Sequence, residues 1–205
     1  LEIAEALRAH LDELKPVSTF AKQDDAHFEA LDKELRFLSN KTVIYGANVD
    51  EAGLLEENDF VKALKAHAKA VGADVVVLCA KVEEEMVALE EEEAEEFLKE
   101  LGVQESGLKQ IIRLAFEKLG LASYFTAGVK EVRAWTIRKG WRAPKAASVI
   151  HNDFEKGFIR AEVIGYDDYI ACQGETGAKE AGKMRLEGKE YVVQDGDVMH
   201  FRFNV

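Results

Sequence analysis

Residues 43–51 read VIYGANVDE, an apolar run that ends in Asn48 and is followed three residues later by Glu51. Residues 54–73 then repeat apolar side chains at helical spacing up to Gly72, a residue typical of a helix end. Residues 74–80, DVVVLCA, form a second apolar run, rich in β-branched side chains. A strand, a helix and a strand at this spacing predict a βαβ unit with two parallel strands buried on both faces.

Polar residues follow both predicted strands. Asn48, Val49 and Glu51 follow the first strand, and Lys81 follows the second directly after Cys79 and Ala80. Ligands of parallel α/β sheets bind beyond the carboxyl ends of the strands. An amide can both donate to and accept from a purine edge, and a carboxylate accepts from N–H groups. The two strand ends therefore indicate a site that grips a nucleotide base from two sides.

A purely structural interpretation of the same residues stays open. Asn48 can cap the helix that follows it, and Asp50 and Glu51 then favour the positive end of that helix dipole. Cys79 is equally compatible with a small, buried core residue. The spacing alone does not separate these roles from base binding.

The remaining chain divides into a helical part and an α+β part. Residues 1–38 predict two helices, the first ended by Pro16, and residues 90–101 predict a helix with an acidic, solvated face. Residues 106–120 predict another helix, with Ser106 as N-cap. Its expected inward side chains are Leu108, Ile111, Ile112, Ala115, Phe116 and Leu119.

Beyond residue 120 we expect a compact module of two hairpins around one helix. The first hairpin covers residues 129–143 with its turn at Lys139-Gly140, and the helix covers residues 144–154. Residues 158–166 predict a strand, and residues 191–205 predict a closing hairpin. Its last strand alternates, with Met199, Phe201 and Phe203 on one face and His200, Arg202 and Asn204 on the other.

Composition narrows the class of protein. The chain has 205 residues, of which 47% are hydrophobic and 32% are charged, so a packed core is expected. The net charge of −12 is uneven: residues 1–119 carry 14 basic and 27 acidic residues, whereas residues 120–205 carry 13 and 12. No apolar run approaches the ~20 residues that span a bilayer. We expect a cytoplasmic monomer that does not contact a membrane.

Catalytic and metal-binding motifs are missing from the sequence. Its five histidines are scattered singly, its two cysteines form no CxxC motif, and no GxSxG motif occurs. We therefore expect no catalytic residue and no metal ligand in this chain.

A basic hairpin is the second candidate site. Its cations, interleaved with Trp135 and Trp141, are Lys130, Arg133, Arg138, Lys139, Arg142 and Lys145. Basic and aromatic side chains together suit contact with an RNA backbone and stacking on bases. The alternative is a solvated hairpin whose tryptophans pack in the core.

Four stretches resemble the YchF/Obg-like ATPase family, a branch of the translation-factor P-loop NTPases and GTP-binding proteins. They are YFTAGVKEVRAWTI at 124–137, IHNDFEKGFIRAEVI at 150–164, GAKEAGKMRLEGK at 177–189 and YVVQDGDVMHFRFNV at 191–205. The resemblance covers nearly the whole chain. It implies part of a helical, coiled-coil insertion at 1–39, the C-terminal half of a G domain at 40–102, a connecting helix at 103–119 and a ubiquitin-like β-grasp TGS domain at 120–205.

The resemblance also implies roles for the strand ends. GTPases of this class carry an Asn-Lys-x-Asp motif whose Asp reads guanine, whereas Val49 and Glu51 stand here at the Lys and Asp positions. That departure is associated with adenine. Asn48, the Val49 backbone and Glu51 would read the base, and Cys79, Ala80 and Lys81 would form the second base loop.

The sequence contains no phosphate loop of the form G-x-x-x-x-G-K-[ST]. In the family this loop and the Mg²⁺-binding Asp precede the helical insertion, so we expect them before Leu1. Phosphoryl transfer depends on positioning the phosphates and the metal, and we expect no hydrolysis of ATP by these residues alone.

The favoured function is therefore a ribosome-associated ATPase that uses ATP and Mg²⁺ when its phosphate-binding half is present. The alternative is a free-standing module that binds RNA or the ribosome and has no nucleotide function.

Overall fold

The computed structural model describes residues 1–128 and 131–204. The chain divides into two units, Leu1–Ile111 and Ile112–Val205. Its parallel and mixed sheets with helices confirm the predicted mixture of α/β and α+β structure. In the part of the chain that is described, no helix is long and apolar enough to cross a membrane.

The first unit begins with two helices, α1 (Glu2–Asp12) and α2 (Ala26–Leu35). Short 3-10 turns lie at η1 (Val17–Thr19) and η2 (Leu38–Asn40). The prediction that the first helix ends by Pro16 is confirmed. The two helices and η1 share a small apolar core, made of Ile3, Leu7, Val17, Phe20 and Phe28.

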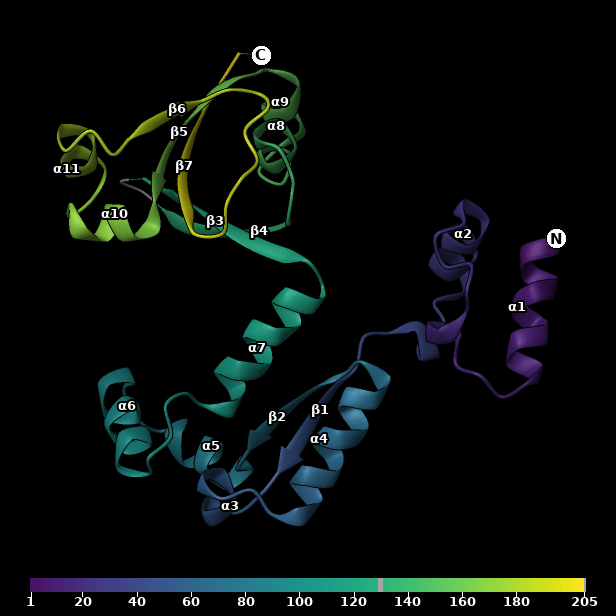
Figure 1. Ribbon diagram of the computed structural model, residues 1–205. Helices are drawn as coiled ribbons and strands as arrows, with labels where there is room; N and C mark the ends of the chain where they lie inside the picture. The colour runs from purple at the N-terminus through teal and green to yellow at the C-terminus, as the bar shows by residue number, and fades with distance from the viewer. Residues whose placement is uncertain (129–130, 205) are drawn as a thin grey trace. The chain divides into compact units, whose positions relative to one another are not determined.

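The predicted βαβ unit is present. Strands β1 (Ile44–Asn48) and β2 (Asp74–Leu78) are parallel, and their last residues, Asn48 and Leu78, are register partners. Helix α4 (Asp59–Val71) lies against both strands (Figure 1). The expectation of strands buried on both faces is wrong for the described residues, because only Ala47 and Val76 are fully buried.

The single helix predicted over residues 54–73 is wrong. The chain forms α3 (Glu51–Leu55), leaves the helical conformation, and starts α4 one residue after Asn58. Asn58 caps α4 by accepting a hydrogen bond from the Val61 backbone N–H at 3.0 Å. At the other end Gly72 adopts a left-handed φ of 71°, as its helix-ending role requires.

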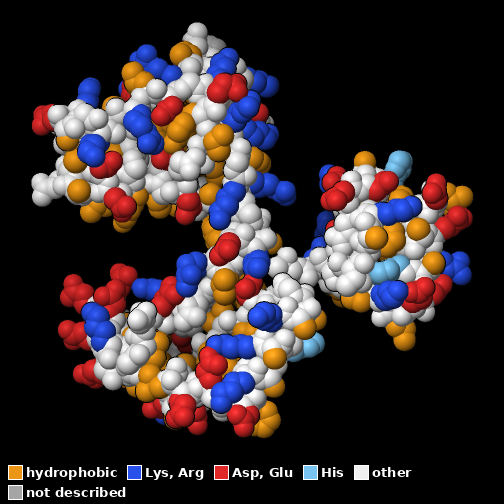
Figure 2. All heavy atoms as spheres, viewed as in Figure 1, with side chains coloured by type: hydrophobic (Ala, Val, Ile, Leu, Met, Phe, Trp, Pro, Cys, Tyr) orange, Lys and Arg blue, Asp and Glu red, His pale blue; other side chains and the backbone are white. Residues whose placement is uncertain are grey.

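Three further helices complete this stretch: α5 (Ala80–Met86), α6 (Glu91–Glu100) and α7 (Gly107–Lys118). Figure 2 shows acidic side chains gathered over α6, as its predicted solvated face requires. Ser106 caps α7 by accepting from the Lys109 N–H at 3.1 Å, which confirms that prediction. The predicted inward face of α7 is partly wrong, since Leu108, Ile112 and Leu119 are exposed.

The second unit is built on a five-stranded sheet in the order β4-β3-β7-β5-β6. Its strands are β3 (Leu121–Ala127), β4 (Val132–Arg138), β5 (Phe158–Gly165), β6 (Arg185–Glu187) and β7 (Asp197–Phe203). Strand β7 lies between β3, to which it is parallel, and β5, to which it is antiparallel. The last strand of the chain therefore occupies the centre of the sheet.

Both predicted hairpins of this unit need correction. Strand β4 pairs with the preceding strand β3, so the Lys139-Gly140 turn follows the hairpin instead of forming its tip. The closing hairpin predicted over 191–205 does not form: among the described residues Val192 makes only an isolated bridge to Arg142, and β7 pairs with β3 and β5. The alternation predicted for β7 is correct: Met199 and Phe201 are buried, whereas His200 and Arg202 are exposed.

Helices lie on both faces of this sheet. The buried Tyr124 donates its hydroxyl to the Ala146 carbonyl in α8 (Ala143–Ala147) at 3.1 Å. The next residue, Phe125, points to the opposite face, where its ring lies 5.8 Å from Tyr166 at the start of α10 (Tyr166–Ala171). The main core, with Ile137, lies on the α8 side.

The helix predicted at 144–154 is two helices, α8 and α9 (Asn152–Lys156). His151 begins the second of them, since its ring accepts from the Asp153 N–H at 3.2 Å. Between β5 and β6 the chain forms α10 and α11 (Glu175–Glu180).

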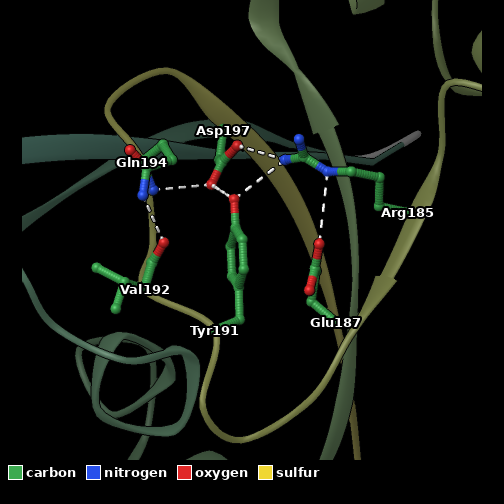
Figure 3. A network of polar contacts seen from close by, with 6 residues as sticks. All are labelled: Arg185, Glu187, Tyr191, Val192, Gln194 and Asp197. Carbon is green, nitrogen blue, oxygen red and sulfur yellow. Dashed lines mark hydrogen bonds and ion pairs between the residues drawn. The ribbon is translucent and has the colours of Figure 1, made fainter.

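A buried carboxylate fixes the start of β7. Asp197 is 3% exposed and accepts from the Tyr191 hydroxyl at 2.7 Å and from the Gln194 N–H at 2.9 Å (Figure 3). Arg185 of β6 adds an ion pair at 3.4 Å. Burial, and then the hydrogen bond to Asp197, raise the pKa of Tyr191, so its hydroxyl remains a donor. The network thus joins β6, the preceding loop and β7.

Candidate functional site

The ends of β1 and β2 build the candidate site. Because the two strands are parallel and in register at Asn48 and Leu78, the loops after them leave the same edge of the sheet. The Val49 N–H continues the ladder by donating to the Leu78 carbonyl at 2.8 Å. The predicted base-reading residues are therefore brought together by strand pairing.

Asn48 links the two loops directly. Its side-chain oxygen accepts a hydrogen bond from the Ala80 N–H, the first residue of α5, at 2.9 Å. An amide that accepts through its oxygen keeps its NH₂ group for another acceptor. Asn48 thus holds the second loop in place and still offers a donor.

Asp50, and not Asn48, caps the helix that follows β1. The Asp50 carboxylate accepts from the Gly53 N–H at 2.9 Å at the start of α3. A Cβ atom on Gly53 would lie 2.7 Å from the Cβ of Val49, so only glycine fits this tight turn. The alternative that Asn48 caps this helix is therefore wrong: Asp50 is the cap, and Asn48 accepts from Ala80.

Lys81 and Glu51, one from each of the two loops, form an ion pair at the site. The Lys81 ammonium lies 2.9 Å from the Glu51 carboxylate and 3.8 Å from Glu85. The hydrogen bond to Glu51, strengthened by the charges of Glu51 and Glu85, raises the pKa of Lys81 above its ordinary value. All three side chains remain solvent-accessible, so the pair can rearrange around a ligand.

A cleft of about 740 Å³ lies between these loops and α4. Asn48, Val49, Glu51 and Lys81 contribute polar or backbone surface. Cys79, which is 4% exposed, reaches the cleft, as expected of a small buried residue. The rest of the lining includes apolar side chains of α4, namely Phe60, Val61 and Leu64.

The ring of Phe60 is the part of the site that the sequence does not reveal. Helical spacing places Phe60 on the same side of α4 as Leu64, four residues later, and does not distinguish a cleft residue from a core residue. Asn58, two residues before Phe60, could have indicated where α4 begins, because an Asn just before an apolar helical stretch is typical of an N-cap.

Within residues 1–128 and 131–204, no group of three or more His, Cys, Asp or Glu side chains could hold a metal ion. The cleft's polar side chains suit a base edge: the amides of Asn48 and Asn58, the carboxylates of Asp50 and Glu51, and the ammonium group of Lys81.

The described cations of the basic hairpin do not form one surface. Arg133 lies on the face of β4 that carries Ile137 and α8, and its guanidinium stacks 4.1 Å from the Trp135 ring. Arg138 alternates to the opposite face, where Lys139 lines a cavity of about 440 Å³ with Phe125. Lys130 lies outside the described residues.

The tryptophans and several cations already have protein partners. Trp135 and Trp141 pack against the core, and Trp135 donates to the Thr126 hydroxyl at 2.9 Å. Arg142 pairs with Glu190 at 2.7 Å and Lys145 with Glu155 at 3.6 Å. These contacts support the structural interpretation of the tryptophans.

Comparison with known proteins gives the family of the chain. A family model described as YchF-GTPase_C, a protein of unknown function (DUF933), matches residues 121–204. The ribosome-binding ATPase YchF of Bacillus subtilis is 50% identical over 206 residues, covering 100% of this chain and 56% of that protein. The chain belongs to the YchF family.

Other YchF proteins agree with this assignment. The ribosome-binding ATPase YchF of Haemophilus influenzae is 58% identical over 173 residues, covering 84% of this chain and 47% of that protein. The structure of the Schizosaccharomyces pombe YchF GTPase matches with a TM-score of 0.80 at 35% identity, covering 98% of this chain and 53% of the other. The chain spans about half the length of the curated relatives it matches.

Proposed function

We propose that the cleft between β1, β2 and α4 binds the adenine base of ATP in a ribosome-associated ATPase of the YchF type. The relatives are named ribosome-binding ATPases, which supports both the nucleotide and the ribosome as partners. In this proposal the phosphates and Mg²⁺ are held by residues outside this chain, which therefore has no hydrolytic activity alone.

The observation that carries the proposal is the hydrogen bond from Ala80 to Asn48. A guanine base presents its O6 oxygen, which needs a donor, whereas adenine presents an amine. The Ala80 N–H is already donated to Asn48, so it is not available to O6. The NH₂ group of Asn48 remains for the ring nitrogen N7, an acceptor in both purines.

Acceptors for the adenine amine are present beside Asn48. The Val49 N–H is used by Leu78, so the Val49 backbone can contribute only its carbonyl oxygen. The Glu51 carboxylate is a second acceptor, held beside the cleft by Lys81. Both groups favour an amine over a carbonyl oxygen at this edge of the base.

The second unit is proposed to be the β-grasp TGS domain. A five-stranded mixed sheet with α8 on its core face supports this. We assign residues 1–39 to the helical insertion, 40–102 to the G domain, 103–119 to the connecting helix and 120–205 to the TGS domain. The ribosomal partner would place the protein in the cytoplasm, and a monomeric state stays a prediction.

Titration of the chain with adenosine and guanosine, followed by amide NMR shifts, tests the base site. We expect shifts at Asn48, Glu51 and Lys81, with adenosine bound more tightly. Replacing Asn48 with Ala removes one donor and frees the second loop, so affinity should fall about tenfold, as for the loss of one buried hydrogen bond. Asn40→Ala, which lies outside the cleft, is the matched control. Unchanged adenosine binding by Asn48→Ala, or tighter binding of guanosine, would refute the proposal.

A further inference from the structure

Phe60 has an unusual setting for a large aromatic side chain. It is 87% exposed, yet it lines the same cleft as Asn48 and Glu51. Exposed apolar side chains occur singly on most proteins, and Val87 is 86% exposed without reaching any cleft described above. The position of Phe60 at the cleft, and not its exposure alone, makes it a candidate for ligand contact.

The exposure of Phe60 is fixed by the start of α4. The Asn58 side chain caps the helix at the Val61 N–H, and the Asn58 carbonyl accepts from the Lys62 N–H at 3.1 Å. The neighbouring Val61 is 2% exposed, so its side chain is packed inside the unit. The backbone that carries Phe60 is therefore held from both sides, and the ring is presented outward by the helix geometry.

The lining of the cleft combines two kinds of surface that match a flat heterocycle. Asn48 and Glu51 supply hydrogen-bonding groups, and Phe60 and Leu64 supply apolar side chains. A nucleobase has a polar edge and two apolar faces. Stacking on an aromatic ring removes such a face from water and tolerates any base, because every base has a π-face.

We infer that Phe60 stacks on one face of the bound purine and is a binding determinant of the base site. Its role differs from that of Asn48 and Glu51: Phe60 supplies affinity for an aromatic base, and the strand ends select which base. This inference rests on the proposed base site and adds to it a residue on α4.

Three variants separate stacking from general apolar contact. Phe60→Ala removes the side chain, Phe60→Leu keeps apolar volume without a π-face, and Phe60→Trp enlarges the ring. Val87→Ala is the matched control for loss of an exposed apolar side chain. The probes are adenosine and purine riboside, which lacks the exocyclic amine, and affinities are measured by NMR titration of the chain.

We expect Phe60→Ala to weaken both probes by the same factor, about tenfold, the usual effect of removing a stacking ring. Phe60→Leu should lose most of the affinity that Phe60→Ala loses. Phe60→Trp should keep the affinity of the unaltered chain, and Val87→Ala should leave the affinity unchanged. The urea midpoint should stay the same in all variants, because the ring is exposed.

Two results would overturn the inference and are distinguishable. If the unaltered chain binds adenosine through Asn48 and Phe60→Ala binds it equally well, Phe60 is no stacking residue and the base site stands. If the unaltered chain binds neither probe at millimolar concentration, the base site itself is wrong, and the inference falls with it.

Discussion

At the scale of single residues, Glu162 of β5 and Arg202 of β7 form an ion pair between the two strands. Two hydrogen bonds, of 3.3 and 3.1 Å, join the guanidinium to the carboxylate. This contact lowers the pKa of Glu162 below its ordinary value of 4.5, against the opposing effect of burial. The pair lies on the face opposite the main core, because the neighbouring Ala161 and Phe201 point into that core.

The pair should make the stability of the second unit depend on pH. The pKa of Glu162 is lower in the folded state, so the pair's contribution is complete above pH 4.5 and disappears as pH falls through the folded pKa. Arg202→Gln should lower the free energy of unfolding at pH 7 by up to about 1 kcal/mol, since the arginine is half exposed and solvent screens it. Urea unfolding at pH 7 and pH 3 measures the difference.

Glu162→Gln is the partner control for this prediction. Glu162→Gln should lower the free energy of unfolding at pH 7 by a similar amount. Adding it to Arg202→Gln should lower the free energy of unfolding little further. A difference between Arg202→Gln and the unaltered chain that is as large at pH 3 as at pH 7 would contradict the ionic origin.

At the scale of elements, the start of α4 depends on one side chain. Asn58→Ala leaves the Val61 N–H without its acceptor and should destabilise the first unit by about 1 kcal/mol, the usual effect of losing an N-cap. Asn58→Asp should retain most of the stability, because a carboxylate caps equally well. Urea unfolding of both variants, with Asn40→Ala as control, tests this; equal stability of the Ala and Asp variants would exclude the cap as the cause.

Element type could be read from the sequence better than pairing. The β1–α4–β2 order, the Ser106 cap and the alternation of Met199 and Phe201 follow from local patterns and were predicted correctly. The break before α4 was missed, since the apolar spacing continues from Leu54 to Val61 across non-helical residues.

Strand pairing could not be predicted for the second unit. Residues Lys139-Gly140 are typical of a turn, but they do not indicate which strand pairs with β4. The parallel pairing of β3 with β7 joins residues more than 70 positions apart, such as Phe125 and Val198, and no local signal reports it. The site residues at the ends of the two strands could be predicted from the sequence. The place of Phe60 at the cleft could be found only from the three-dimensional structure.

At the scale of the whole molecule, charge separates the two units. The excess of acidic residues lies in residues 1–119, so contact with RNA is expected from the second unit. There the hairpin cations divide between two faces, and Arg142 and Lys145 are engaged by carboxylates. The RNA contact predicted for this hairpin is therefore best tested face by face.

Paired charge reversals distinguish the two faces. If Arg138 and Lys139 contact ribosomal RNA, their joint replacement by Glu should weaken co-sedimentation with ribosomes and reduce the salt dependence of binding by about two ion equivalents. Reversal of Arg133 and Lys145 is the matched control and should have a smaller effect. Salt-insensitive binding that neither pair alters would argue against an RNA contact through this hairpin.

The central place of β7 has a consequence for how the protein is made. A ribosome that has not yet added Asp197–Phe203 has produced β3 with β4, and β5 with β6, but nothing that joins the two pairs. The sheet can close only after translation has passed residue 203 and this segment has left the exit tunnel. Until then the nascent chain presents two unpaired strand edges, which is when a chaperone or a misfolding partner has access to it.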